Sequence, residues 1–337
     1  MSTAAPERQV EIPTEPEQPT AFDTRKRVFA FIGTFIGVTV PMVGVVAAAV
    51  LLWGHGFGWV DFGLLVGMYT VTMLGITVGF HRLFTHRSFQ AVKPVQVIFG
   101  ILGSMSFQGP LIDWVGRHRL HHQYSDHDGD PHSPYPHSPG ILGWLAGFWH
   151  SHIGWAFSPM QEGLERYAGD LRRSPTIRFV SNMFPLWALL GVTIPAAIGY
   201  AFGGWEGAFS GFIWGGLVRI FLGHHFTWSV NSICHLWGSQ PYDSDDHSRN
   251  NAFVGVFAMG EGWHNNHHAF PSSARHGLQW WQIDVSYYVI RALVFCGLAW
   301  KVRLPSAADL IARAGVKVAV GANISAADDP NYEQDKS

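Results

Sequence analysis

Long apolar stretches constrain this chain most, because each is long enough to cross the hydrocarbon core of a membrane, about 30 Å thick, as a helix. Four are predicted, at residues 28–53, 60–80, 179–202 and 208–230. Pro41 predicts a kink in the first, and Arg219 in the fourth either snorkels or serves a function. Only 14% of the residues are charged, against about 25% in soluble domains. The sequence predicts an all-α integral membrane protein with four transmembrane helices.

Basic residues indicate the orientation of these helices. They precede the first stretch, follow the second and precede the third: Arg25, Lys26, Arg27, Arg82, Arg87, Arg172, Arg173 and Arg178. The connections at 54–61 and 203–207 contain no Lys or Arg. Because cytoplasmic loops carry the excess of Lys and Arg, we expect a multi-pass protein of the cell membrane with both termini in the cytoplasm.

The rest of the chain predicts one domain with two tails. Residues 1–23 contain four prolines and no apolar periodicity, which is typical of disorder. Residues 24–305 form the predicted domain, in which a cytoplasmic helical cap joins the membrane helices. Residues 306–337 combine a weakly amphipathic segment with a polar tail. A net charge of −2 gives no reason to expect a nucleic-acid partner, and two cysteines cannot form a cysteine-rich metal site.

Histidine is the unusual residue, with nineteen copies. Three clusters lie on the predicted cytoplasmic side: His81 and His86; His118, His121 and His122; and His264, His267 and His268. On a helix, positions i, i+3 and i+4 share a face, so three imidazoles can point to one place. Eight imidazoles exceed the four to six ligands that one ion uses, which favours two metal ions. We interpret His55, His137, His247 and His276 as ordinary histidines.

The clusters lie in motifs that resemble those of the membrane fatty-acyl desaturases, over residues 24–290. The motifs are HRLFTH (81–86), HRLHH (118–122), DPHS (130–133), HSHIGW (150–155), NSICH (231–235) and GEGWHNNHH (260–268). They are most similar to those of the Δ9 acyl-CoA (stearoyl-CoA) type and its actinobacterial members. The resemblance implies that the cap contains a histidine-ligated di-iron centre.

The resemblance also implies which residues bind each iron and form the catalytic centre. It adds His235 as a ninth ligand and Asn231 as a residue that reaches a metal through water. One iron would be bound by His81, His86, His118, His122 and His267. The other would be bound by His121, His235, His264 and His268, with Asn231 nearby.

The implied reaction is the O2-dependent introduction of a cis double bond, at Δ9, into a saturated long acyl chain. Two iron ions and O2 would be required, and zinc can replace iron in a purified sample. The sequence contains no haem-attachment or dinucleotide-binding motif and no fused cytochrome region. We therefore expect an external electron donor: an NAD(P)H-dependent reductase, a ferredoxin or a cytochrome.

Three residues are candidates for substrate binding. Trp228 matches a family tryptophan near the substrate, and Tyr69 precedes His81 by twelve residues, about 18 Å along a helix, where it would close the acyl tunnel. Lipid- or helix-facing packing explains Tyr69 equally well. The family's Arg-Asp pair before the second cluster is Gly116-Arg117 here, so Arg117 is a candidate for the carrier's phosphates.

A second departure concerns the same headgroup. The family's basic pair after the HSHIGW segment is Pro159-Met160 here. Arg172 and Arg173 are further basic residues that could bind phosphate, although solvated residues near a membrane are commoner. Long-chain acyl-CoA is the expected substrate, with a lipid or a carrier protein as the alternative carrier.

The same histidines are compatible with functions other than desaturation. A membrane di-iron fatty-acid hydroxylase or alkane monooxygenase would use the same ligands, while the GEGWHNNHH and NSICH motifs favour desaturation. A metal transporter would place ligands near the middle of its spans. A carboxylate di-iron enzyme needs two Glu-x-x-His units, and only residues 261–264 match one. A zinc hydrolase needs three ligands, fewer than this chain offers.

Overall fold

The computed structural model describes residues 21–51, 57–135, 139–158 and 163–314. These residues are mostly helical. This agrees with the predicted helical class, to which the structure adds one small sheet: β1 (Gln90–Ala91) and β2 (Ala299–Trp300) pair antiparallel. The sheet forms because two extended connections run side by side, and the backbone N–H of Val92 donates to the carbonyl of Leu298 at 3.0 Å. Two residues per strand were too short to be visible as a sequence pattern.

Three apolar segments in the described part of the chain are long enough to span a membrane: Phe31–Val50, Trp59–Thr85 and Phe184–Leu236. The first lies in α1 (Ala21–Leu51), a continuous helix despite Pro41. The second joins α2 (Trp59–Leu74) to the π-helix η1 (Gly75–Thr85). The third joins α8 (Phe184–Gly211), the π-helix η4 (Phe212–Val218) and α9 (Arg219–Leu236).

The third segment contains a sharp reversal that separates two of the predicted stretches. Gly203 and Gly204 have non-helical dihedrals, and Gly204 has a φ of 60°, a region that favours glycine. Beyond the reversal the chain packs against itself. A side chain added at Gly199 would lie 2.0 Å from the carbonyl oxygen of Gly207. Small residues thus let the two arms approach backbone to backbone.

Arg219 lies within the second arm and is 1% exposed. Its guanidinium donates to the carbonyls of Gly215, Met105 and Gly191 at 3.1, 2.8 and 2.5 Å. The side chain therefore links α8, η4 and the end of α3 (Lys93–Ser104), and it does not snorkel to the surface. Carbonyl oxygens satisfy its donors in place of water.

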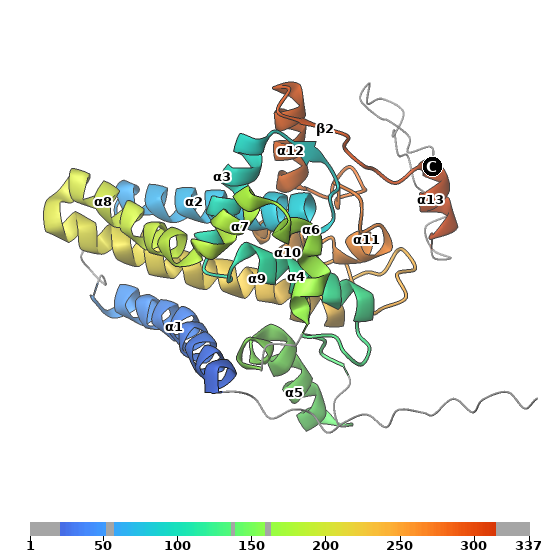
Figure 1. Cartoon of the computed structure of the whole chain (residues 1–337), viewed down its shortest axis with the longest axis horizontal. Helices are drawn as coiled ribbons and strands as arrows, with labels where there is room; N and C mark the ends of the chain where they lie inside the picture. Colours follow the sequence, from blue (N-terminus) through green and yellow to red (C-terminus); the bar gives the residue numbers. More distant parts are fainter. Residues whose placement is uncertain (1–20, 52–56, 136–138, 159–162, 315–337) are drawn as a thin grey trace, which may run out of the picture.

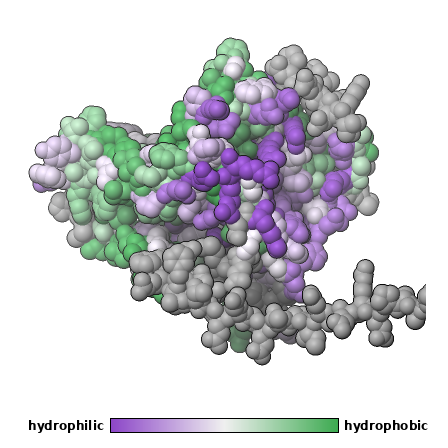
Figure 2. All heavy atoms as spheres, in the orientation of Figure 1, coloured by the Kyte–Doolittle hydropathy of each residue, from purple (hydrophilic) through white to green (hydrophobic). Residues whose placement is uncertain are grey.

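The remaining helices are short and follow the apolar segments. They are α4 (Leu111–Tyr124), α5 (Ile141–His152), η2 (Gly154–Phe157), η3 (Leu164–Ala168), α6 (Gly169–Arg172), α7 (Pro175–Asn182), α10 (Ala252–Phe257), α11 (His264–Ala269), α12 (Val285–Phe295) and α13 (Ala307–Ala312). Figure 1 shows α2 and α8 extending to one end of the molecule, while α4, α10 and α11 gather toward the other. In Figure 2, hydrophobic residues predominate toward the first end, apart from its tip, and hydrophilic residues predominate toward the second.

The described part of the C-terminal segment packs on this second end. Leu310 of α13 is buried with Tyr242 and Phe270. Arg313 accepts a backbone hydrogen bond from Asp243 at 2.9 Å. Residues up to 314 therefore belong to the same packed unit as the chain around α11. Of the predicted tails at 1–23 and 306–337, residues 1–20 and 315–337 lie outside the described residues, whereas residues 21–23 belong to α1 and are helical instead of disordered.

Candidate metal centre

The first histidine pair is positioned by the π-helix η1. A π-helix joins residue i to i+5, and the backbone N–H of His86 donates to the carbonyl of His81 at 3.1 Å. Residues five apart therefore lie on one face. Close packing supports this helix, because a side chain on Gly75 would lie 2.2 Å from the backbone nitrogen of Gly103 on α3. The HRLFTH spacing fits a π-helix, whereas an α-helix would bring residues i and i+4 together.

The other histidines come from three helices. His118, His121 and His122 lie on α4, and His264, His267 and His268 lie on α11. His235 lies at the last turn of α9. The sequence from Trp263 to Ala269 is wholly buried, so α11 inserts its imidazoles into the interior of the protein.

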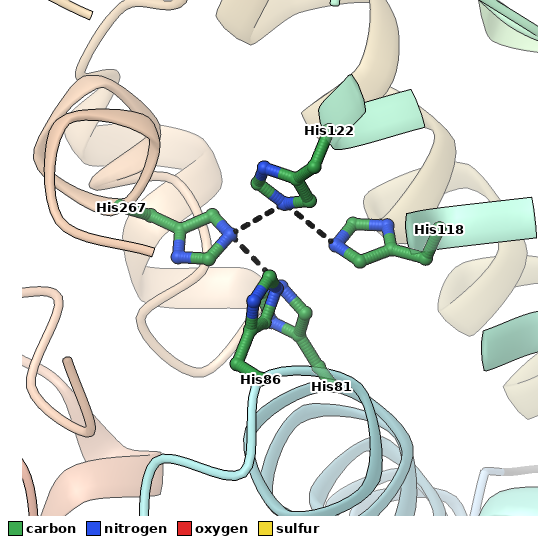
Figure 3. A group of neighbouring side chains, drawn as sticks. All are labelled: His81, His86, His118, His122 and His267. Carbon is green, nitrogen blue, oxygen red and sulfur yellow. Dashed lines mark hydrogen bonds between the residues drawn. The ribbon is translucent and has the colours of Figure 1, made fainter. Parts of the chain in front are cut away.

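The nine side chains form two groups whose candidate donor atoms lie within 4.8 Å of one another. The five-histidine group is His81, His86, His118, His122 and His267. The four-histidine group is His121, His235, His264 and His268. Figure 3 shows the rings of the first group pointing at a common centre. This membership is the same as that of the two ligand sets that the resemblance implies.

Within each group, Nε2 atoms of different histidines lie close to one another. In the five-histidine group, His267 Nε2 lies 3.1 Å from His81 Nε2 and 3.0 Å from His122 Nε2, and His122 Nε2 lies 3.1 Å from His118 Nε2. In the four-histidine group, His264 Nε2 lies 3.1 Å from His235 Nε2. The imidazole nitrogens therefore converge from separate helices.

Carboxylates orient four of the rings through Nδ1. His81 contacts Glu261 at 2.7 Å. In the four-histidine group, the Nδ1 contacts are His121 with Asp130 at 3.0 Å, His235 with Asp126 at 2.8 Å and His268 with Asp246 at 2.5 Å. A carboxylate beside Nδ1 places the proton there and leaves the Nε2 lone pair pointing inward.

These lone pairs test whether a metal fits. The Nε2 atoms of His86, His121 and His268 are buried without a hydrogen-bond partner among the described residues. Buried polar atoms without partners are unfavourable and therefore rare. Converging imidazole lone pairs are satisfied by a divalent transition metal such as iron or zinc. The donor sets thus fit two metal ions.

The sequence interpretation gave no role to the four carboxylates. Asp126, Asp130 and Asp246 lie in loops after α4 and α9, at no regular spacing from the histidines that they contact. Asp130 and Glu261 lie within the quoted motifs. The one available signal was that acidic residues occur close to histidine clusters in the sequence. This closeness did not show which carboxylate contacts which histidine.

His276 is another residue whose place the sequence did not reveal. We interpreted it as an ordinary histidine, and it is indeed fully buried. However, its ring centre lies 4.4 Å from that of His267, and its Nδ1 lies 3.3 Å from Glu261. His132 likewise lies beside His121, with ring centres 4.2 Å apart. Both imidazoles therefore line the centre. His55 and His137 lie outside the described residues.

The predicted substrate residues lie away from these contacts. Tyr69 donates from its hydroxyl to the Phe257 carbonyl at 2.6 Å, which links α2 to α10. Trp228 is buried on α9, with its ring 4.9 Å from that of His224. Arg117 lies over the Trp155 ring at 5.0 Å.

The structure also shows where other positions singled out in the sequence lie. Asn231 is half-buried on α9, one turn before His235. Gly116 lies against η3, where a side chain would meet the Leu164 carbonyl at 2.9 Å. A larger side chain at this position would require η3 to shift. Pro159-Met160 lie outside the described residues.

Burial favours the neutral form of four of these imidazoles, whereas Asp126 raises the pKa of His235. Desolvation, followed by neighbouring imidazoles, lowers the pKa of His118, His122, His264 and His267 well below the usual value, which is about 6.5. Neutral imidazole is the form that binds metal. The four side chains are therefore ready to bind metal at neutral pH.

These pKa shifts predict that acid destabilises the metal-free protein. Below about pH 6.5 the unfolded imidazoles bind protons, while the folded ones stay neutral until much lower pH. The unfolded state then binds more protons, so the free energy of unfolding falls by up to about 1.4 kcal/mol per pH unit for each such histidine. Melting temperatures in detergent should decrease from pH 7.5 to pH 5. A metal-free protein that is more stable at pH 5 would contradict this assignment.

Comparisons with known proteins find a matching family and several similar relatives. The fatty acid desaturase family model matches residues 57–294. A hex-5-enoyl-[acyl-carrier protein] acetylenase of Moorena producens is 45% identical over 80% of this chain and 84% of its own. An acyl-CoA C20 Δ5-desaturase of Anemone leveillei is 42% identical, over 74% and 76%. An sn-1 stearoyl-lipid 9-desaturase of Synechocystis is 40% identical, over 74% of both chains.

Proposed function

Since this chain belongs to the fatty acid desaturase family, we propose that it introduces a cis double bond, at Δ9, into a saturated long acyl chain. The observation that carries the proposal is the pair of histidine groups, whose inward-pointing nitrogens fit two metal ions. The chemistry that bound iron supplies is the activation of O2 into an oxidant able to remove hydrogen from an unactivated carbon, with two electrons per turnover from an external donor.

We assign each group one iron, with Asn231 near the four-histidine site. The protein's own contribution is to position the metal ligands and to limit the access of water. Carboxylates fix the rings of His81, His121, His235 and His268. The histidines of the centre come from η1, α4, α9 and α11, and α11 is buried throughout. Such a rigid and largely buried site limits side reactions of a strong oxidant.

The membrane arrangement that supports this function has four crossings. The reversal at Gly203–Gly204 divides the longest apolar segment into two arms, one on each side. We propose that both arms, α1 and the α2–η1 segment cross the cell membrane, with both termini and the histidines in the cytoplasm. We propose a desaturase domain over residues 24–305; the packing of α13 against Tyr242 and Phe270 supports including residues up to 314.

The acyl chain would pass the histidine centre and end near Tyr69. The Tyr69 ring meets Phe226 edge-on at 6.3 Å, and its hydroxyl reaches α10. Both contacts place an immobilised aromatic ring between α2, α9 and α10, beside the buried side chain of Met73. A fixed ring at this depth is suited to close a tunnel between these helices.

Truncating Tyr69 is expected to favour longer acyl chains. If the ring closes the tunnel, Tyr69→Ala makes room for further methylenes, each worth about 0.8 kcal/mol, or roughly fourfold in relative kcat/KM. Products from a mixture of saturated chains would be measured by mass spectrometry. Tyr69→Phe is the matched control: it removes the hydrogen bond, retains the ring and should retain the wild-type profile. An unchanged profile in Tyr69→Ala would refute this role.

The proposed carrier is coenzyme A. Relatives named for acyl-carrier protein, acyl-CoA and lipid substrates all match this chain, so family membership leaves three carriers to distinguish. Arg172 and Arg173 are exposed at the end of α6, where they could contact the phosphates of the carrier. Trp228 and Arg117 remain proposed substrate contacts.

Zinc is the metal that we expect to replace iron in purified samples.

A carrier competition tests the substrate. The iron-loaded protein would receive the same saturated chain as acyl-CoA, acyl-carrier protein and membrane lipid, each with O2 and a reductase, ferredoxin or cytochrome system. We expect a new double bond in the acyl-CoA pool. A double bond in the lipid or carrier-protein pool alone would refute the coenzyme A assignment and retain the desaturase assignment.

A further inference from the structure

The two histidine groups differ in the carboxylates that support them. In the four-histidine group, His121, His235 and His268 each contact an aspartate, at 3.0, 2.8 and 2.5 Å. In the five-histidine group, only the His81–Glu261 pair is of this kind among the described residues. Three of four candidate ligands are supported in one group, against one of five in the other.

Neighbouring cations increase this difference. Glu261 forms an ion pair with Arg82 at 2.9 Å, so its charge is already compensated. Among the described residues, no Arg or Lys forms an ion pair with Asp126, Asp130 or Asp246. Their other partners are neutral: Ser133 donates to Asp126, and Ser248 donates to Asp246. The four-histidine group therefore faces three uncompensated negative charges in a buried environment.

Burial differs in the same direction. His121, His235, His264 and His268 are all buried, whereas His86, His118 and His122 are each partly exposed. Solvent therefore reaches the edge of the five-histidine group. A chelator or a proton arriving from solution meets that group first.

We infer that the four-histidine group binds its metal first and retains it, and that the five-histidine group is the exchangeable site. This inference rests on the proposed function, which requires two irons. Carboxylates beside Nδ1 make imidazole a stronger donor, and each such partner typically contributes 10- to 100-fold in metal affinity. The three aspartates also attract a divalent cation directly. The five-histidine group has one more imidazole, which by itself would raise its metal affinity. That additional ligand is neutral, and three of the five histidines are partly exposed to solvent.

Chelation of the wild-type protein tests the order. The full chain would be loaded with Fe²⁺ without oxygen in detergent, mixed with excess EDTA, and analysed for iron over time. We expect two phases of one equivalent each, with rates at least about tenfold apart. Anomalous scattering from crystals of the half-depleted protein should place the remaining iron in the four-histidine group. Equal rates, or remaining iron in the five-histidine group, would overturn the inference.

Variants identify the cause. Asp126→Asn and Asp246→Asn should accelerate the slow phase about 10- to 100-fold and leave the fast phase unchanged. Asp170→Asn is the matched control, because this carboxylate binds Arg119 and Arg87 instead of a histidine; both phases should be unchanged. Acceleration by the control equal to that in the two variants would overturn the inference. If a variant fails to fold, the wild-type occupancies decide. Binding of fewer than two irons would instead refute the proposed function.

Discussion

Replacing His264 by alanine is expected to abolish double-bond formation and to remove one of two bound irons. The side chain is 2% exposed, and its Nε2 lies 3.1 Å from that of His235. Changes in residues that only support a metal ligand already reduce affinity or activity 10- to 100-fold, so loss of the ligand should reduce activity by more than about 100-fold. Product formation and iron content would be measured on the same sample.

His127 provides the matched control. It lies exposed after α4, and its Nδ1 contacts only the Ser125 carbonyl of its own turn, at 2.7 Å, among the described hydrogen bonds. His127→Ala should retain both irons and at least about half of the activity, as expected for a surface substitution. Full activity of His264→Ala with two irons bound would remove His264 from the centre.

Replacing Arg82 by methionine is expected to cause the largest loss of stability. Arg82 is fully buried and forms ion pairs with Glu261 at 2.9 Å and Asp284 at 3.0 Å. Asp284 also accepts hydrogen bonds from the backbone of His276 and Gly277. Without the guanidinium, two carboxylates remain buried without their cation. Removing one partner of a buried pair typically lowers the free energy of unfolding by about 3–5 kcal/mol.

Arg87 supplies the comparison on the surface. Its side chain is 58% exposed and forms an ion pair with Asp170. Exposed pairs of this kind contribute about 0–1 kcal/mol, so Arg87→Met should unfold close to the wild type. Thermal and denaturant unfolding in detergent would measure both variants. If Arg82→Met were also within about 1 kcal/mol of the wild type, the buried ion pairs would not support the centre.

The apolar segments were predictable because membrane helices carry a strong composition signal, while their boundaries were not. The first helix begins at Ala21 instead of 28 and passes through Pro41, since a proline can be accommodated within a packed membrane helix. The change from α- to π-helix occurs at Gly75, which packs closely against Gly103 in a tertiary contact. Such contacts leave no periodicity in a single sequence.

The candidate site also contains residues that were predictable from the sequence and residues that were not. Spacing indicated eight histidines: six lie in two clusters whose i, i+3 and i+4 positions share a helix face, and His81 and His86 lie five residues apart. The resemblance added His235. The aspartates and His276 were not predictable, because they reach the centre from loops. Asp126 meets His235 from 109 positions away in the sequence. Only the folded chain brings such pairs together.

The most direct measurement of the proposed activity is the mass of the product. The purified, iron-loaded protein would receive a saturated long-chain acyl-CoA, O2 and an electron-donor system, with omission of O2 or of the donor as controls. A desaturase yields an acyl chain lacking two hydrogens, with a cis double bond at one position, only when O2 and the donor are both present. A product that gains an oxygen atom would indicate a hydroxylase, and product formation without O2 would contradict the oxidative di-iron assignment itself.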